Sequence, residues 1–266
     1  GQPYNMPMLR KMMEMHCNLI DYERVVDDQG RRQIFFGRYA GLAGMINSLW
    51  SMGLRLKEAG YNTPFSQIKQ AHHYSSLAEA RMAISKVGQQ IAENGLPDAL
   101  TPFTVAFTGY GNVSQGAQEI IGLLPVIEIS PDELLSLKKR SKIPDNLIYK
   151  IVFREEHLVE PVEPGQEFDL QDYYNEPEKF RSVFEKYIPY LDMMINCVYW
   201  DIRYPRLVTK DFLQQLFAKG TPKLKVIGDI SCDVNGSVEC TDKGTEIEDP
   251  IFVYHPATRT HTMGYQ

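Results

Sequence analysis

Residues 103–124, FTVAFTGYGNVSQGAQEIIGLL, decide the fold of this chain. The run that begins at Phe103 is rich in β-branched and aromatic residues, which is typical of a strand, and it stops at Gly109. An apolar-periodic segment that indicates a helix begins after Gly111. The stretch therefore predicts a strand, a tight glycine turn and a helix in succession.

The turn resembles the phosphate-binding fingerprint G-x-G-x-x-G, with Gly109, Gly111 and a serine, Ser114, in place of the third glycine. Glycines let the backbone approach a diphosphate, and the free N–H groups at a helix start supply donors. The motif alone is weak, because glycine turns also join strands to helices for architectural reasons. Its place between a strand and a helix favours dinucleotide binding.

A second strand, residues 125–129, leads to the position that contacts the adenosine ribose in such folds. Glu128 and Ser130 bracket the expected spacing of about 20 residues from the first glycine. An uncharged strand end at Ser130 leaves room for a 2′-phosphate, and the basic residues 138–140 follow it. We therefore expect NADP rather than NAD, although such a basic triplet is more commonly a solvated helix face.

The rest of the chain alternates between strand and helix patterns, which predicts an α/β fold with a Rossmann-like, doubly wound parallel sheet. Tyr199, Trp200 and Asp229 lie at the carboxyl ends of two successive predicted strands, where ligands bind in open α/β sheets. Strands are expected at residues 19–23, 32–36, 147–153, 193–199, 224–229, 238–241 and 251–254, and helices at 6–17, 42–59, 76–94, 178–190 and 209–218.

Composition excludes several classes of protein. Of 266 residues, 43% are hydrophobic and 23% charged, which is ordinary for a globular domain. The net charge is −6 and no long basic run occurs, so nucleic-acid binding has no electrostatic support. No apolar stretch is long enough to suggest a membrane span. The four cysteines form no C-x-x-C pair, so we expect neither disulfides nor a metal site.

Six stretches, in order along nearly the whole chain, resemble a known family. They are similar to the lysine-ketoglutarate reductase part of α-aminoadipic semialdehyde synthase and, more distantly, to fungal lysine-forming saccharopine dehydrogenase. The stretches are QGRR at 29–32, FGRYAGLAGMIN at 36–47, MGLRL at 52–56, FTGYGNVSQGAQ at 107–118, INCVYW at 195–200 and GDISCD at 228–233.

The resemblance implies a reaction and an architecture. The family condenses L-lysine with 2-oxoglutarate and reduces the imine to saccharopine with NADPH or NADH. Its fold is like that of alanine dehydrogenase, with two Rossmann-like domains, the first of them discontinuous. We expect residues 1–36 to belong to the substrate domain, residues 37–235 to form the dinucleotide-binding domain, and residues 236–266 to return to the substrate domain.

The resemblance also assigns residues. Gln2 and Phe36 correspond to substrate-binding positions and Arg31 to a position near the cofactor. The catalytic His and Lys are expected upstream of Gly1, so the chain looks like a fragment that binds dinucleotide but turns over poorly or not at all. The cofactor positions are Gly109, Gly111, Asn112 and Val113 for the diphosphate, Ser130 for the ribose, and Val198, Tyr199, Trp200 and Asp229 for the nicotinamide side.

Two alternatives remain open at this point. One is a related alanine dehydrogenase or transhydrogenase module, and the other is a non-catalytic dinucleotide-binding domain. The resemblance further implies lysine, 2-oxoglutarate and saccharopine as small-molecule partners, fusion to a glutamate-forming saccharopine dehydrogenase domain, a homo-oligomer, and a mitochondrial or cytoplasmic location. Neither nucleic acid nor a membrane is expected as a partner.

Overall fold

The computed structural model describes residues 5–265, so the predicted substrate-binding residue Gln2 lies outside the described part. Two compact units, Gly1–Phe36 and Gly37–Gln266, make up the chain and are described separately. The assignment of these parts to a substrate domain and a dinucleotide domain stays a prediction.

The first unit has little regular structure. It contains helix α1 (Met6–Glu14), whose methionines are exposed or partly exposed rather than packed in a core, and a 3-10 helix at Tyr22–Arg24. The hairpin expected between residues 19–23 and 32–36 is wrong, since only one bridge joins Val26 to Arg32. The Asp27 carboxylate holds the intervening turn by accepting from the N–H groups of residues 29 and 31.

A five-stranded parallel sheet forms the centre of the second unit and confirms the predicted α/β class. Its strand order is β2, β3, β1, β6, β7. These strands are β1 (Phe103–Thr108), β2 (Val126–Glu128), β3 (Ile148–Phe153), β6 (Met193–Asn196) and β7 (Val226–Asp229). Two small antiparallel pairs lie outside this sheet: β4 (Val159–Pro161) with β5 (Phe180–Ser182), and β8 (Phe252–His255) with β9 (Thr260–Met263).

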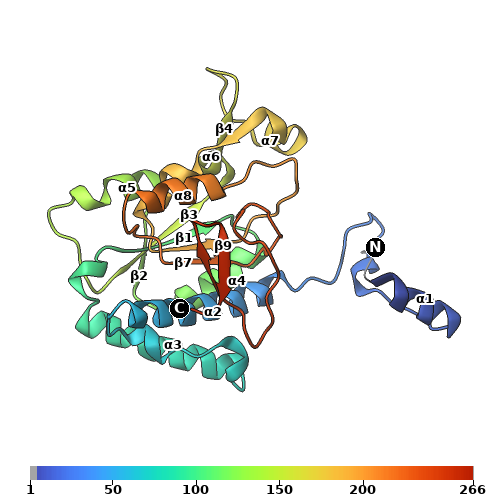
Figure 1. Cartoon of the computed structure of the whole chain (residues 1–266), viewed down its shortest axis with the longest axis horizontal. Coiled ribbons are helices and arrows are strands. Elements are labelled where there is room, and N and C mark those ends of the chain that lie inside the picture. The colour runs from blue at the N-terminus through green and yellow to red at the C-terminus, as the bar shows by residue number, and fades with distance from the viewer. Residues whose placement is uncertain (1–4, 266) are drawn as a thin grey trace. The chain divides into compact units, whose positions relative to one another are not determined.

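Helices cover both faces of the sheet (Figure 1). On one face α2 (Gly37–Glu58), α3 (Leu77–Asn94) and α4 (Asn112–Ile121) pack on Phe103, Val105 and Phe107 of β1. On the other, Ala106, Tyr149 and Ile151 contact a second apolar cluster. That side carries α5 (Pro131–Ser136), α6 (Glu155–Leu158), α7 (Leu170–Asn175) and α8 (Lys210–Ala218).

Helix ends follow their capping residues closely. The Ser76 hydroxyl accepts from the Glu79 N–H at the start of α3, and Gly95 ends that helix with φ +73°. The Thr209 hydroxyl accepts from the Phe212 N–H at the start of α8. Such caps satisfy backbone donors that a helix start leaves free, which is why these two helices were predicted to within a residue.

Two expected elements of the second unit are also wrong. Residues 178–190 form β5 and 3-10 turns instead of a helix, because the chain pairs with β4 and Pro189 interrupts any continuous helix. Residues 238–241 contribute a single bridge, Val208 to Val238, rather than a strand. Further 3-10 helices occupy Pro64–Gln67, Ala71–His73, Asp98–Leu100, Leu137–Lys139, Pro177–Lys179, Phe184–Lys186 and Ile188–Tyr190. None of the helices within residues 5–265 combines the length and apolar character needed to cross a bilayer.

Candidate dinucleotide site

The glycine turn lies at the carboxyl end of β1, in the middle of the sheet. Gly109 has φ +84°, a left-handed conformation that favours glycine, and its N–H donates to the Phe153 carbonyl at the end of β3 (3.0 Å). A Cβ at Gly109 would lie 3.4 Å from the carbonyl oxygen of Cys197 after β6. The turn is therefore fixed between the ends of β3 and β6.

The start of α4 is open to a ligand. Gly111 is the N-cap of α4, no side chain of the described residues caps this helix, and a Cβ at position 111 would meet no atom within 4 Å. Gly111 and Asn112 are exposed. The N–H groups of the first helical turn, including those of Asn112 and Val113, are thus available as donors at the positive end of a helix. Such a cradle fits a diphosphate.

A buried hydrogen-bond network joins the ends of β1, β6 and β7. The Thr108 hydroxyl donates to Oδ1 of Asn196 (2.8 Å), and Nδ2 of Asn196 donates to Oδ1 of Asp229 (2.8 Å). The Thr241 hydroxyl donates to the second oxygen of Asp229 (2.6 Å). Burial raises the pKa of Asp229, and these donors oppose that rise because they stabilise the carboxylate. Asp229, a predicted nicotinamide-side residue, thus has a fixed orientation.

The other predicted nicotinamide-side residues follow β6. The side chain of Val198 lies beside Gly109, since a Cβ there would be 3.5 Å from Cγ1 of Val198. Tyr199 projects into solvent and is 79% exposed. The Trp200 indole donates to the Tyr204 carbonyl (3.1 Å) and is partly buried. Of this trio, Val198 is therefore the one that adjoins the glycine turn.

Ser130, the predicted ribose residue, has a structural role. Its hydroxyl accepts from the Glu133 N–H and its own N–H donates to the Glu133 carboxylate, a capping box that starts α5. It lies at the end of β2, which β3 separates from β1. Within the basic triplet, Arg140 binds the same Glu133 carboxylate (3.0 Å). The neighbouring Glu128 pairs with Lys150 of β3 (2.7 Å).

A pair of residues that the sequence analysis did not single out lies beside the glycine turn. Thr108 of β1 is in register with Phe153 of β3, so the next residue, Arg154, is adjacent to the turn. The Arg154 guanidinium lies over the ring of Tyr110, 4.6 Å from its centroid. Tyr110 and Arg154 are 44 positions apart in the sequence, so their proximity can be predicted only when the order of the strands is known.

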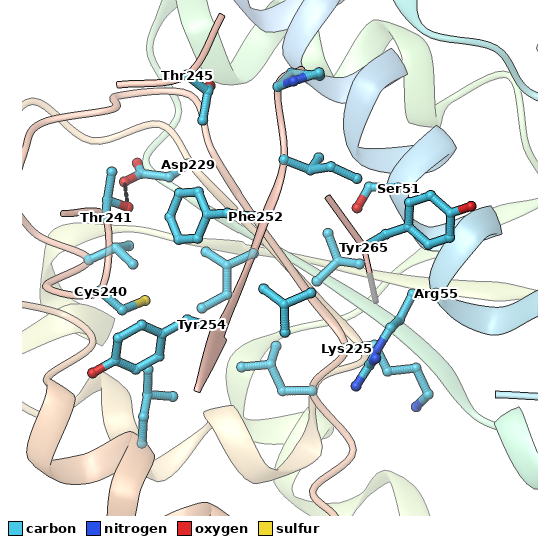
Figure 2. Close-up of a pocket in the computed structure, with 18 of the residues that line it drawn as sticks. Ser51, Arg55, Lys225, Asp229, Cys240, Thr241, Thr245, Phe252, Tyr254 and Tyr265 are labelled. Carbon is cyan, nitrogen blue, oxygen red and sulfur yellow. Dashed lines mark hydrogen bonds between the residues drawn. The ribbon is translucent and has the colours of Figure 1, made fainter. Parts of the chain in front are cut away.

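A separate cavity of about 260 Å³ lies along β7 and the β8–β9 hairpin. Figure 2 shows Arg55 and Lys225 together at one end of it and the hydrogen-bonded Asp229–Thr241 pair at the other. Its lining includes Asp229 but neither Gly109 nor Gly111. The cavity thus touches the Asp229 network and is distinct from the glycine turn.

Two predicted residues lie in the first unit. The Arg31 side chain donates to Asp27 (2.8 Å), and its backbone N–H is the main reason that the pKa of Asp27 is lowered. The Phe36 ring contacts Tyr22 edge-on, with 5.5 Å between centroids. Their predicted roles toward cofactor and substrate stay predictions, as do the roles of the other site residues.

Three known proteins that are similar to this chain share one name. The chain is 40% identical over 98% of its length to an Arabidopsis thaliana α-aminoadipic semialdehyde synthase, of which it covers 25%. It is 37% and 38% identical, over 96% of its length, to the mitochondrial enzymes of that name from Mus musculus and Bos taurus, of which it covers 29% each. The chain thus spans between a quarter and a third of these relatives.

Two other comparisons add little. No family model matches the chain. An L-alanine dehydrogenase structure is similar over 83% of this chain, at 18% identity and a TM-score of 0.31. The resemblance carried by the six sequence motifs is confirmed by the relatives themselves. Along nearly its whole length, this chain is homologous to a part of the α-aminoadipic semialdehyde synthases.

Proposed function

We propose that this chain is the dinucleotide-binding part of a lysine-ketoglutarate reductase, an oxidoreductase of lysine degradation. The reaction condenses L-lysine with 2-oxoglutarate and reduces the resulting imine to saccharopine. The bound dinucleotide supplies the hydride that reduces the imine carbon. The observation that carries the proposal is the uncapped glycine turn at the end of β1, in a chain with 40% identity to a synthase of this name.

In this proposal the chain's own residues bind the dinucleotide and orient it. The N–H groups after Gly111 hold the diphosphate, and Gly109 keeps the backbone close enough for that contact. Val198 and the fixed carboxylate of Asp229 border the nicotinamide side, together with Tyr199 and Trp200. NADP is the proposed cofactor, with NAD as the alternative. Arg31 near the cofactor, and Gln2 and Phe36 toward the substrates, complete the proposed set.

Imine formation and reduction need an acid and a base of suitable pKa. The residues proposed above bind and orient the dinucleotide and the substrates, so binding is the property to test on this chain. We further propose fusion to a glutamate-forming saccharopine dehydrogenase domain, assembly as a homo-oligomer, and a mitochondrial or cytoplasmic location, since the mammalian relatives are named mitochondrial.

Calorimetry with NADPH and two variants of Gly111 tests the proposal. Gly111 is an N-cap with an extended backbone, so Asp or Asn fits there and caps α4. Gly111→Asp should keep or raise the melting temperature yet abolish NADPH binding, because its carboxylate takes the helix donors and repels the diphosphate. Gly111→Asn adds the same bulk without charge and should weaken binding less. Unchanged NADPH affinity in Gly111→Asp would exclude this site.

Substrate assays on the full-length protein separate the reductase from its alternatives. Lysine-dependent NADPH oxidation in the presence of 2-oxoglutarate is the expected activity. Alanine formation from pyruvate and ammonia would instead identify an alanine dehydrogenase. Tight NADPH binding without either activity would identify a non-catalytic dinucleotide-binding domain.

A further inference from the structure

The order of the strands decides which residue can reach the adenosine ribose. In a doubly wound dinucleotide fold the ribose is read at the carboxyl end of a strand that neighbours the central one. Here β3 neighbours β1, while β2 lies at the edge of the sheet. Since adjacent strands lie about 4.8 Å apart, the end of β2 is roughly 10 Å from β1. The ribose-reading position therefore moves from the end of β2 to the end of β3.

On this basis, which rests on the proposed function, we propose that Arg154 binds the 2′-phosphate of NADP. Arg154 follows the last residue of β3, and that residue, Phe153, is in register with Thr108 and accepts from the Gly109 N–H. On the opposite side of β1, the ends of β6 and β7 hold the Asp229 network. The adenosine end thus lies toward β3 and the nicotinamide end toward β6.

The Arg154 side chain has donors to offer. It is exposed, and within residues 5–265 no carboxylate or other acceptor is hydrogen-bonded to its guanidinium group; its backbone N–H donates to Nδ1 of His157. Its contact is with the face of Tyr110, an aromatic platform in the glycine turn itself. A guanidinium group presents several N–H donors in a planar fork that matches phosphate oxygens. Stacking on Tyr110 holds that fork at the turn before a ligand arrives.

Two carboxylates next to Arg154 oppose phosphate binding. Glu155 and Glu156 follow Arg154 and would repel a phosphate. Glu155 is engaged by the Tyr174 hydroxyl, which donates to it at 2.8 Å. Burial and the Glu155 charge raise the pKa of Tyr174, so the hydroxyl remains a donor. Glu155 is the residue that would bind the ribose hydroxyls if the cofactor were NAD, which makes the cofactor preference the decisive measurement.

Calorimetry on the full chain with four ligands isolates the 2′-phosphate: NADPH, NADH, adenosine 2′,5′-bisphosphate and adenosine 5′-monophosphate. The wild type should prefer each 2′-phosphorylated ligand over its partner. Arg154→Met keeps an apolar stem on Tyr110 and removes the charge. It should weaken the 2′-phosphorylated ligands about 10- to 100-fold and the other two by less than about threefold.

Arg140→Met is the matched control, since it removes the same charge from the segment after β2. It should change all four affinities by less than about twofold, because β2 is remote from the glycine turn. Arg154→Lys keeps the charge without the planar fork and should give an intermediate loss. Thermal unfolding checks that each variant is folded. The melting temperatures should be close to that of the wild type, because the substituted side chains are exposed.

The platform supplies a second test. Tyr110→Phe keeps the ring and should preserve the preference for NADPH, whereas Tyr110→Ala should reduce it as the Arg154 side chain loses its support. If the ratio of NADPH affinity to NADH affinity is unchanged in Arg154→Met, or if the preference for NADPH disappears in Arg140→Met, the inference is overturned while the proposed function stays intact. Absence of binding by both dinucleotides to the wild type overturns both.

Discussion

Gly41 of α2 lies against the carbonyl oxygen of Val113 in the first turn of α4, so closely that a Cβ at position 41 would overlap that oxygen. The same Cβ would lie 2.8 Å from the backbone nitrogen of Ala117. Backbone atoms cannot move aside as the end of a flexible side chain can. Gly41 thus serves helix packing, and it fixes the position of the helix whose first turn forms the candidate diphosphate site.

Gly41→Ala should therefore destabilise the protein, even though alanine is the better helix former. We expect a loss of about 1–3 kcal/mol in the free energy of unfolding, as for other overpacked sites. Gly37→Ala is the control, because a Cβ there meets Val113 at an ordinary 3.4 Å. Urea unfolding of both variants gives the comparison, and equal stability of the two would contradict the packing argument.

Asp192 forms a buried ion pair at the amino ends of the central strands. It is 1% exposed, accepts from the Thr104 N–H (2.8 Å) and pairs with Lys223 and Lys225. Asp192→Asn would leave the Lys223 charge buried without its counter-ion, at a cost of about 3 kcal/mol. Lys225→Met removes the more exposed of the two lysines and should lower the free energy of unfolding by less.

The loss in Asp192→Asn should depend on pH. Burial lowers the pKa of Lys223 from 10.5, and the carboxylate of Asp192 opposes that shift. Without the carboxylate the folded pKa falls further, so between that value and 10.5 the unfolded chain binds more protons than the folded one. Stability of the variant should therefore rise with pH across this range. A pH-independent deficit, measured by urea unfolding, would contradict this account.

The order of strands illustrates what the sequence could and could not predict. The glycine turn, α3 and α8 were predicted well because each depends on local chemistry, namely glycine conformation or a capping hydroxyl. The neighbour of β1 depends on how two crossovers are arranged in space, which no local pattern states. A spacing of about 20 residues from Gly109 therefore predicted a ribose position at the end of β2 and did not indicate Arg154, at the end of β3.

A signal for the true order was nevertheless present in the sequence. Residues 148–153 are six long and, apart from Lys150, apolar on both faces, and all are buried or partly buried in the structure. Residues 126–128 are three long, and Ile127 is 41% exposed. A strand buried on both faces belongs inside a parallel sheet, and a short, half-exposed one belongs at its edge. Length and two-sided hydrophobicity would have placed β3 next to β1.

Thr241 should stabilise Asp229 in its charged form only. Its hydroxyl donates to the carboxylate, which lowers a pKa that burial raises above 3.8. Thr241→Val should cost about 1.5–3 kcal/mol at neutral pH, as for a hydrogen bond to a charged group. Because the folded pKa is raised, the carboxylate forms only as pH increases above 3.8, and the cost should shrink as pH falls back through this range. Unfolding measurements at several pH values check this, and a cost that does not vary with pH would show that the bond does not depend on charge.

Ser130 should behave as a helix cap whatever it contributes to ribose binding. Ser130→Ala removes the hydroxyl that accepts from the Glu133 N–H, so α5 loses its cap. The free energy of unfolding should fall by about 1 kcal/mol. Affinity for NADPH, measured by calorimetry, should change less than about twofold, because β3 lies between Ser130 and the glycine turn. Ser130→Thr retains an acceptor and is the control for stability. A loss of NADPH affinity in Ser130→Ala alone, at unchanged stability, would return the ribose position to the end of β2 and argue against Arg154.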